Sequence, residues 1–479
     1  MAWFAEKNRF SLLAFSLVSV GFLFFVKHEL VPTLSLNRDL WFNSSNSLSL
    51  FTKKPNSVPV YTTPKPVTSE SLLSSDQSNY SMNSSIFETT QVDISATNGV
   101  PVEETTQKVG YLEEKPGFNG ETELDIDGAM EKCDIYTGKW VKADDYPLYP
   151  PGSCPYVDEA FSCQENRRPD VDYLNWRWKP DGCEIPRFNA IDFLERIRGK
   201  RLMLVGDSMN RNQFESMVCL LHEALPNKSR MYERHGYRIT KGRGYYIFQF
   251  MDYNSTIEFS RSHFLVREGT HLTSKGKSRS TLMIDQIERT STRWKHADIL
   301  IFNTGHWWTH GKTSKGKDYY QEGDYIYPQF DSLEGYKRAM RTWGKWIDQN
   351  LDPKKYLVFY RGYSNAHFRG GDWDSGGTCN GETEPISRGN YLENYPVKMR
   401  VIEEVIHEMK TPVIFLNITR LTNYRKDAHP SIYSKTLTAG QRVSKRVQDC
   451  SHWCLPGVPD AWNELIYATL VMNSRSKSG

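Results

Sequence analysis

The chain has 479 residues, enough for one large domain or two domains, and 38% of them are hydrophobic. Its formal net charge of +3 offers no electrostatic basis for binding nucleic acid, so we expect no nucleic-acid partner. Aromatic residues make up 13% of the chain. Such rings fill cores and, when exposed, stack on sugar rings, so the composition leaves a carbohydrate-related role open.

The N-terminus predicts a membrane anchor. Residues Phe10–Val26 are 17 apolar or small residues without a charge, which is the low end of what spans a bilayer as a helix. A cleaved signal peptide is the alternative, but the segment is longer than usual for one and no Ala-x-Ala site follows it. We expect a cytoplasmic tail at 1–9, a signal anchor at 10–26 and a lumenal remainder, which makes a type II protein.

Residues 27–131 are expected to form a disordered stem. Ser, Thr, Asn and Pro dominate the stretch from about Asn37 to Gln107, which cannot bury enough apolar area to offset its chain entropy. Asn-x-Ser/Thr sequons are candidates for glycosylation in such a compartment. They stand at Asn43, Asn79, Asn83, Asn227, Asn254 and Asn417.

The eight cysteines all follow the anchor and predict four disulfides, because the compartment is oxidising. They are Cys133, Cys154, Cys163, Cys183, Cys219, Cys379, Cys450 and Cys454. Zinc is the alternative, but the only close pair, Cys450-x3-Cys454, has no second matching pair, and we expect no metal. Residues 132–190 hold four cysteines and many aromatic residues, so we interpret them as a small stapled module.

Residues 191–479 predict an α/β domain with a parallel sheet. Apolar runs typical of buried strands recur at 201–205, 298–302, 356–360 and 412–416, and helical patterns cover 331–350 and 396–410. Strands that alternate with helices favour a parallel sheet flanked by helices. Tyr237–Val266 predicts a hairpin with a turn near Asn254, as an insertion in that sheet.

A Gly-Asp-Ser sequence follows the first of these strands. Gly206-Asp207-Ser208 lies at a strand-to-helix turn, which exposes a hydroxyl and aims backbone N–H groups at it. The same three residues also make an ordinary turn with an N-capping Ser, so the motif by itself is a weak signal. Sites in parallel sheets gather beyond the carboxyl ends of the strands, where Asn303 also stands, as a possible oxyanion donor.

The base that Ser208 would need is found near the C-terminus. Asp449 and His452 are three residues apart, so one helical turn would bring their side chains together, and the carboxylate would then orient the imidazole. Asp427 and His429 are the rival pair, but they stand two apart and Pro430 follows. The alternative for Asp449 and His452 is a non-catalytic one, in which they stand at the solvent-exposed start of a helix.

Longer motifs carry a family resemblance. Gly206-Asp207-Ser208 together with Asp449-Cys-Ser-His-Trp-Cys-Leu-Pro-Gly-Val-Pro-Asp460 resembles the plant trichome birefringence-like family, over roughly residues 132–472. Further family-like stretches are Cys133–Trp140, Trp178–Cys183 and Phe359–Ser364. Members of this family pair a cysteine-rich module with a GDSL/SGNH-like domain, and the resemblance implies Golgi enzymes that O-acetylate cell-wall polysaccharides.

The resemblance implies roles for individual residues. Ser208 is the expected nucleophile, His452 the general base and acid, and Asp449 its orienting carboxylate. Asn303 and the Ser208 backbone N–H are the expected oxyanion donors. Position in the sequence, and not the resemblance, suggests the substrate contacts: Arg211, one helical turn after Ser208 and facing the cleft, and Trp307 and Trp308, which follow a predicted strand. An exposed helix arginine is the alternative for Arg211. Cys450 and Cys454 are expected to bond to distant cysteines, one of them in the N-terminal module, so that the His452 loop is held in place.

Two other functions stay open at this point. An esterase would use water in place of a sugar hydroxyl, and a non-catalytic protein would bind or bridge pectin or another polysaccharide through exposed Trp and Tyr. No bound cofactor is expected; an acetyl donor enters as a co-substrate, with acetyl-CoA as one candidate. The acceptor could be xylan, mannan, xyloglucan or pectin.

Overall fold

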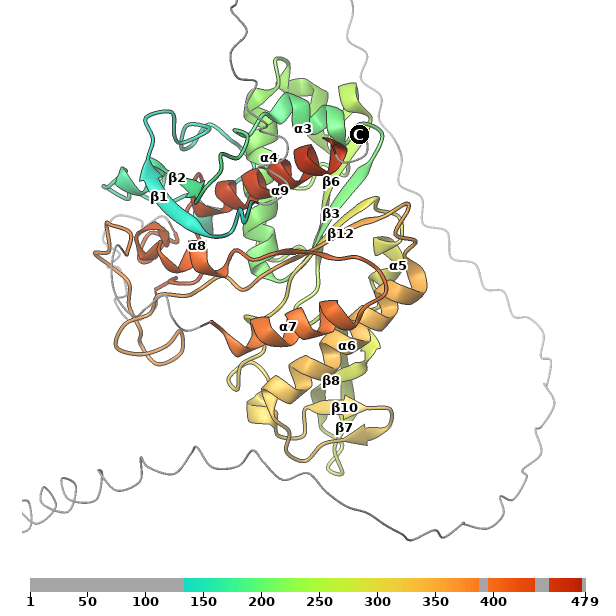
Figure 1. Cartoon of the computed structure of the whole chain (residues 1–479). Helices are drawn as coiled ribbons and strands as arrows, with labels where there is room; N and C mark the ends of the chain where they lie inside the picture. The colour runs from blue at the N-terminus through green and yellow to red at the C-terminus, as the bar shows by residue number, and fades with distance from the viewer. Residues whose placement is uncertain (1–132, 387–394, 436–447, 476–479) are drawn as a thin grey trace, which may run out of the picture. The chain divides into compact units, whose positions relative to one another are not determined.

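The computed structural model describes residues 133–386, 395–435 and 448–475, which belong to one compact unit (Figure 1). The predicted anchor and stem, with Asn43, Asn79 and Asn83, lie outside the described residues. Within those ranges, no helix is both long and apolar enough to cross a bilayer.

The core of the fold is a seven-stranded, mostly parallel sheet of order β13-β12-β9-β3-β6-β5-β4. Its five parallel strands are β13 (Ile414–Leu416), β12 (Leu357–Arg361), β9 (Ile299–Phe302), β3 (Arg201–Gly206) and β6 (Ser255–Arg261). β5 (Tyr245–Phe250) and β4 (Met231–Glu233) complete the sheet in antiparallel orientation. The four predicted strands are confirmed, each within two residues of its predicted start.

Helices cover both faces of this sheet, as Figure 1 shows. α3 (Ala190–Arg196), α4 (Ser208–Ala224) and α9 (Val458–Arg475) lie on one face, and α5 (Ser291–Trp294), α6 (Ser332–Asn350) and α7 (Val397–Glu408) on the other. Alternate residues of β3 enter two different cores: Leu202 and Leu204 pack with α4 and α9, whereas Met203 and Val205 pack with α6 and α7. Burial on both faces explains why these strands are continuously apolar.

The predicted hairpin exists, but it is not an insertion in the sheet. β5 and β6 are joined through a turn at Asn254, whose φ is 48°, and β6 pairs in parallel with β3, so the hairpin extends the main sheet. The sequence patterns did not predict a second, four-stranded sheet. It consists of β7 (Val266–Leu272), β8 (Ser278–Ile287), β10 (Tyr320–Glu322) and β11 (Tyr325–Ile326), and it packs against α6.

The cysteine-rich module contains the hairpin β1 (Gly138–Lys142) and β2 (Trp176–Pro180). Four disulfides are present, as predicted: Cys133–Cys183, Cys154–Cys219, Cys163–Cys454 and Cys379–Cys450. Only the first closes the module on itself. Two others join it to α4 and to the segment before α9, and Tyr173 and Trp178 belong to the same hydrophobic core as α4. The module therefore shares the core of the α/β domain.

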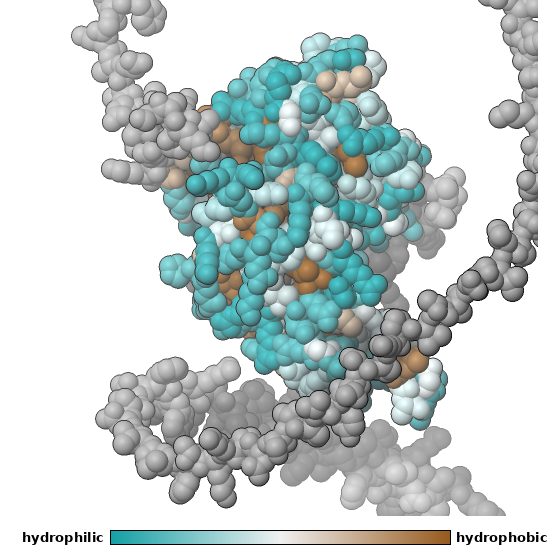
Figure 2. All heavy atoms as spheres, turned by 90° about the vertical axis from the view of Figure 1, so that its right-hand side faces the viewer, coloured by the Kyte–Doolittle hydropathy of each residue, from teal (hydrophilic) through white to brown (hydrophobic). Residues whose placement is uncertain are grey.

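Short helices connect these parts. They are η1 (Glu159–Phe161), η2 (Asp172–Leu174), η3 (Lys228–Arg230), η4 (Met251–Tyr253), η5 (Ser314–Gly316), α8 (Thr419–Asn423) and η7 (Lys426–Ala428). The face in Figure 2 is mainly hydrophilic, with scattered apolar residues, as expected for a surface in water. The carboxyl ends of β3, β9, β12 and β13 meet at one edge of the sheet, which is where sites of such sheets form.

Candidate active site

Ser208 lies at this edge, on the turn between β3 and α4. The Asp207 carboxylate caps α4 by accepting a hydrogen bond from Met209 N at 2.9 Å, and Ser208, half-buried, is the first residue of the helix. A Cβ at Gly206 would lie 2.0 Å from Asn303 Oδ1. The turn therefore requires glycine before Asp207, because β9 passes too close for a side chain.

Asp449, His452 and Ser208 form a continuous chain of hydrogen bonds. His452 Nε2 lies 2.7 Å from Ser208 Oγ, and His452 Nδ1 lies 2.8 Å from Asp449 Oδ2. The predicted pairing of Asp449 with His452 is thus present, but the predicted helical turn is wrong. Asp449 Oδ1 instead accepts hydrogen bonds from the backbone N–H groups of Ser451 (3.2 Å) and His452 (3.0 Å), which closes an Asx-type turn.

The same contacts keep Asp449 ionised. Burial opposes the charge, but the electrostatic attraction of His452 and the hydrogen bonds from His452 and Ser451 outweigh it and hold the pKa of Asp449 well below its ordinary value. A carboxylate at Nδ1 fixes a proton on that nitrogen and leaves Nε2 to accept the proton of Ser208. The arrangement can therefore activate a serine nucleophile.

Two disulfides flank His452, and both lead to distant cysteines, as predicted. Cys454 bonds to Cys163 of the N-terminal module, and Cys450 bonds to Cys379 of the loop after β12. Phe161 of the module also packs against the His452 imidazole, with ring centroids 5.4 Å apart. The module thus supports the imidazole directly, a contact that the sequence patterns did not reveal.

Two further histidines hold the backbone of His452. His429 Nδ1 lies 2.6 Å from His452 O, His429 Nε2 lies 2.6 Å from His367 Nδ1, and His367 Nε2 lies 3.0 Å from Asn423 O. Because carbonyl oxygens only accept hydrogen bonds, His429 Nδ1 and His367 Nε2 both carry protons. The contact between His429 Nε2 and His367 Nδ1 then holds a proton only when the two histidines together carry a positive charge. Burial opposes that charge: it lowers the pKa of His367 to about 4 and that of His429 well below its ordinary value.

The rival pair of the sequence analysis therefore has other partners. Asp427 is buried and forms an ion pair with Arg425 at 2.9 Å, and His429 bonds to His367 and to the backbone of His452. The structure thus connects Asp449 and His452 to Ser208 by hydrogen bonds, whereas Asp427 and His429 have other partners.

Asn303 is buried beside Ser208, but its carboxamide is engaged. Asn303 Nδ2 donates to Asp207 Oδ1 at 2.9 Å, and Asn303 Oδ1 accepts from Asp207 N at 3.2 Å. The other oxygen of Asp207 lies 3.6 Å from His306 Nδ1. Burial alone would raise the pKa of Asp207, but His306, Arg361 and Asn303 together hold it well below its ordinary value. Nδ2 of Asn303 has a second hydrogen, which it can donate to an oxyanion.

The prediction that Arg211 faces the cleft is wrong. Arg211 is only 4% exposed, and its Nη1 lies 2.8 Å from Glu215 Oε1 and 3.1 Å from Asp158 Oδ2. Its guanidinium also covers Phe161, at 4.6 Å from the ring centroid. Arg211 therefore joins α4 to the module and supports the ring that packs on His452, instead of reaching into solvent.

The two tryptophans after β9 differ in position. Trp308 is buried and donates from Nε1 to Thr304 Oγ1 at 2.9 Å, so the prediction that it contacts substrate is corrected: it is a core residue. Trp307 is half-buried, and the His263 ring stacks on it with centroids 3.9 Å apart. Of the two, Trp307 alone keeps an accessible surface near this edge.

The sequons within the described residues are not equivalent. Asn227 and Asn254 are exposed on the surface. Asn417 is half-buried, and its Nδ2, the atom that would carry a glycan, donates to Tyr395 OH at 3.1 Å. Glycosylation at Asn417 would break this bond, whereas Asn227 is exposed on the surface.

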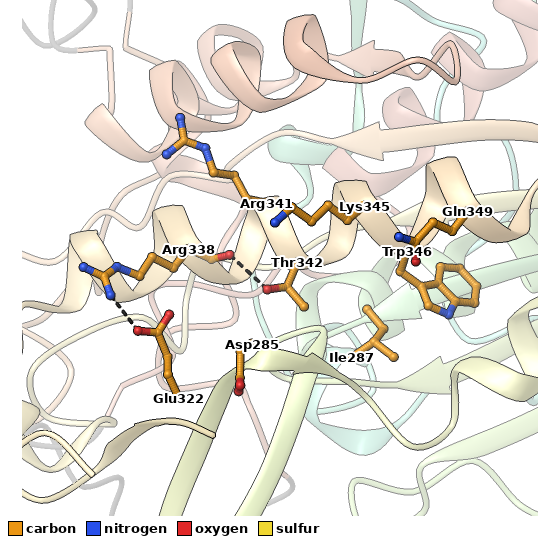
Figure 3. A pocket seen from close by; sticks show the side chains of 9 residues that line it. All are labelled: Asp285, Ile287, Glu322, Arg338, Arg341, Thr342, Lys345, Trp346 and Gln349. Carbon is orange, nitrogen blue, oxygen red and sulfur yellow. Dashed lines mark hydrogen bonds and ion pairs between the residues drawn. The ribbon is translucent and has the colours of Figure 1, made fainter. Parts of the chain in front are cut away.

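A pocket of about 430 Å³ between α6 and β8 contains none of these residues (Figure 3). Its arginines are already paired: Arg338 with Glu322 at 2.6 Å, as Figure 3 shows, and Arg341 with Glu408, outside the pocket, at 2.9 Å. Across 133–386, 395–435 and 448–475, no three His, Cys, Asp or Glu side chains are grouped to hold a metal ion. Among the groups of side chains described here, the hydrogen-bonded chain ending at Ser208 is the one suited to carry out a reaction.

Comparison with known proteins identifies the family of this chain. Residues 185–469 match the GDSL/SGNH-like acyl-esterase family found in Pmr5 and Cas1p, and residues 131–184 match the Pmr5 N-terminal domain. Among curated relatives from Arabidopsis thaliana, trichome birefringence-like 1 is 53% identical over 346 residues, trichome birefringence 51% over 346, and trichome birefringence-like 6 52% over 358.

These alignments cover 72%, 72% and 75% of the chain, and 62%, 57% and 74% of the respective relatives. The chain thus spans less than two thirds of the first two relatives. The two family models together describe a cysteine-rich N-terminal domain followed by an SGNH-like domain. The chain therefore belongs to the trichome birefringence-like family, whose main domain is a GDSL/SGNH-like acyl-esterase domain.

Proposed function

We propose that this protein is an O-acetyltransferase that moves an acetyl group, through an acetyl-serine at Ser208, onto hydroxyl groups of a plant cell-wall polysaccharide. The observation that carries this proposal is the hydrogen-bonded chain from Asp449 through His452 to Ser208. An orienting carboxylate, an imidazole and a serine in this order form an acyl-transfer apparatus.

In the first half-reaction, His452 Nε2 takes the proton of Ser208 as Oγ bonds to the carbonyl carbon of the acetyl donor. The tetrahedral oxyanion is stabilised by the Ser208 N–H, which lies at the start of α4 where the helix supplies no acceptor, and by Asn303. When the intermediate collapses, the bond to the leaving group breaks, and His452 returns the proton to that group. Ser208 then carries the acetyl group.

In the second half-reaction, a sugar hydroxyl replaces the leaving group. His452 accepts the hydroxyl proton while the sugar oxygen bonds to the acetyl carbon, and collapse of the second oxyanion releases Ser208 Oγ, which regains its proton from His452. Asp449 stabilises the imidazolium in both halves without taking its proton. No bound cofactor enters these steps; the acetyl donor is a co-substrate, and acetyl-CoA is one candidate.

We place this reaction in the Golgi lumen. The apolar segment at 10–26 would anchor the protein as a single-pass type II protein, and the polar residues 27–131 would hold the domain away from the membrane. Four disulfides among the eight cysteines suit an oxidising compartment.

An acetylesterase acting on the same polymers is the second candidate, and the acyl-esterase name of the matching family favours it. Both enzymes would share the first half-reaction. They differ in whether water or a sugar hydroxyl attacks the acetyl-serine.

The test uses the purified full-length chain with acetyl-CoA and deacetylated xylan, mannan, xyloglucan and pectin. We expect mass spectrometry to find an acetyl group on Ser208 and then on one polymer, and to find neither with Ser208→Ala. Release of acetate from acetylated polymers without transfer would instead establish the esterase. If the wild type and Ser208→Ala bind polymers alike and neither gains nor releases acetyl groups, the protein is a binding protein.

A further inference from the structure

Trp373 is a large apolar side chain placed in solvent. Its side chain is 46% exposed, whereas every other tryptophan in the described part of the chain is buried or half-buried. It lies in the loop that follows β12. An exposed indole offers a flat apolar surface on which the face of a sugar ring can stack.

The loop around Trp373 is held in a defined shape. Gly377 N donates to Asp372 O at 2.9 Å, Asp372 N donates to Ser375 Oγ at 2.7 Å, and Arg369 and Thr378 pair as a β-bridge. The adjacent Cys379 is bonded to Cys450, the residue after Asp449. The disulfide that holds the segment of Asp449 and His452 thus also holds the tip that carries Trp373.

From this tip, Trp373 reaches the loop that follows β9. The Lys312 ammonium lies 4.0 Å from the centroid of Trp373 and 5.0 Å from that of Trp307, and His263 stacks on Trp307. We call His263, Trp307, Lys312 and Trp373 the Trp373 ladder. Cation–π attraction to one ammonium thus links the two indoles.

The Trp373 ladder is linked through neighbouring residues to the turn that carries Ser208. His306, the neighbour of Trp307, lies 3.6 Å from the Asp207 carboxylate, and Asp207 precedes Ser208. Its other end is linked through Cys379 and Cys450 to Asp449. The ladder thus joins the loops after β9 and β12, and both loops touch residues adjacent to the catalytic chain.

The Lys312 ammonium covers part of the Trp373 ring, and 46% of the Trp373 side chain remains exposed. A Cβ at Gly311 would lie 3.0 Å from Trp373 Cζ2, so the absence of a side chain there allows the indole to settle close to Lys312. A flat apolar face of this kind suits the C–H side of a pyranose ring, while the hydroxyl groups of that ring stay in water.

We propose that the outer face of Trp373 is a sugar-binding platform for the acceptor, on which one pyranose unit of the polysaccharide stacks while another presents its hydroxyl to Ser208. This deepens, and rests on, the proposed transferase function. The ladder fixes the platform relative to Ser208, so it contributes to which hydroxyl of the chain reaches the acetyl group.

The experiment measures binding without chemistry, in the full-length chain carrying Ser208→Ala. Xylohexaose, mannohexaose and hexagalacturonate are the probes. Protection of Trp373 from oxidation by N-bromosuccinimide is mapped by mass spectrometry, and Kd is measured by calorimetry. We expect at least one probe to protect Trp373, and Trp373→Ala to weaken its binding about tenfold, the size of effect expected for a binding hot spot. Trp373→Phe should weaken it less.

Tyr325→Ala is the matched control, because Tyr325 is an aromatic residue with 59% exposure on β11 of the second sheet; it should leave binding unchanged. The proposal is overturned if no probe protects Trp373, or if Trp373→Ala binds every probe like the parent. Equal thermal unfolding of the variants shows that they are folded.

Transfer assays separate this inference from the proposed function. With Ser208 restored, Trp373→Ala should raise the acceptor KM about tenfold with a smaller change in kcat. Platform binding without any acetyl transfer by the wild type would reject the transferase and keep the platform. Transfer with an unchanged acceptor KM in Trp373→Ala would reject the platform and keep the transferase.

Discussion

The two halves of the proposed catalytic chain, Ser208 on one side and Asp449 with His452 on the other, are held in place by different means. Ser208 stands between β3 and α4, and the close approach of Asn303 to Gly206 defines its turn. Asp449 and His452 lie in a segment without helix or strand, held by two disulfides, an Asx-type turn and the contact of His429 with the His452 carbonyl.

This difference shows how an irregular segment can reach the precision of a regular one. A strand and a helix fix a residue through many repeated backbone bonds, whereas a loop has few and needs side chains and covalent links from elsewhere. The N-terminal module supplies Cys163 and Phe161 for this purpose. The module is therefore part of the active-site support, and its loss should affect His452 more than Ser208.

The largest effect should come from the loop half itself. Asp449→Asn removes the carboxylate that keeps a proton on His452 Nδ1, so we expect transfer to fall about 10⁴-fold, as expected when the wrong imidazole tautomer is stabilised. The measurement is kcat for acetyl transfer by Asp449→Asn. Asp427→Asn serves as a comparison for thermal unfolding only. A loss of less than about tenfold would show that Asp449 does not orient His452.

Removing the Cys163–Cys454 disulfide tests the covalent support. The double change to Ser opens a link across 291 residues and should cost up to about 6 kcal/mol in the chain-entropy model. Displacement of His452 should also lower kcat about a hundredfold in molecules that remain folded. The same double change at Cys133–Cys183, which closes only the module, is the control. Equal losses of kcat in both variants would contradict a specific role in holding His452.

Gly206→Ala tests the scaffold half. The added Cβ meets the Asn303 side chain at 2.0 Å and its backbone oxygen at 2.6 Å, so β3 and β9 must separate. We expect a loss of about 1–3 kcal/mol of stability and about tenfold in kcat. Gly242→Ala, where the nearest atom would be 4.0 Å away, is the control and should behave like the wild type. Unchanged kinetics in Gly206→Ala would mean that the turn tolerates the shift.

His429→Asn tests the polar support of the loop. It removes the contact at 2.6 Å with the His452 carbonyl while it keeps a polar side chain in the buried site. We expect kcat to fall about fivefold, because the loop loses one of several restraints, with little change in acceptor KM. If KM rises while kcat is unchanged, His429 acts on substrate binding and not on the position of His452.

The smallest effect concerns pH and Asp460, which joins the end of the loop to α4. Its carboxylate accepts hydrogen bonds from Gly457 N at 2.8 Å and Ser216 Oγ at 2.5 Å, and burial raises its pKa from 3.8 to about 7. A raised pKa means that the folded state binds the proton more tightly than the unfolded state. The resulting stability is fully present below about pH 4 and is lost as the pH rises through about 7.

The wild type should therefore lose a few degrees of Tm between about pH 5 and pH 8. Asp460→Asn, which cannot ionise, should show a smaller change over the same range. Parallel Tm curves for the two proteins would contradict the assignment. Scanning calorimetry at several pH values is the measurement.

Local patterns in the sequence determined much of the fold. The strands β3, β9, β12 and β13, the helices α4, α6 and α7, and the pairing of Asp449 with His452 depend on neighbours within a few residues. Apolar periodicity and short spacings encode these contacts directly. The signature that ends at Asp460 is long and specific enough to indicate the family by itself.

Tertiary structure decided which distant side chains meet. Arg211 and Trp308 lie next to the predicted site in sequence, yet one pairs with Asp158 and the other enters the core. Cys163 and Cys454 are 291 residues apart, and Trp373 reaches Lys312 from another loop. A side chain's surroundings depend on how whole elements pack, and packing is a sum over contacts between segments whose spacing along the chain carries no signal of their proximity.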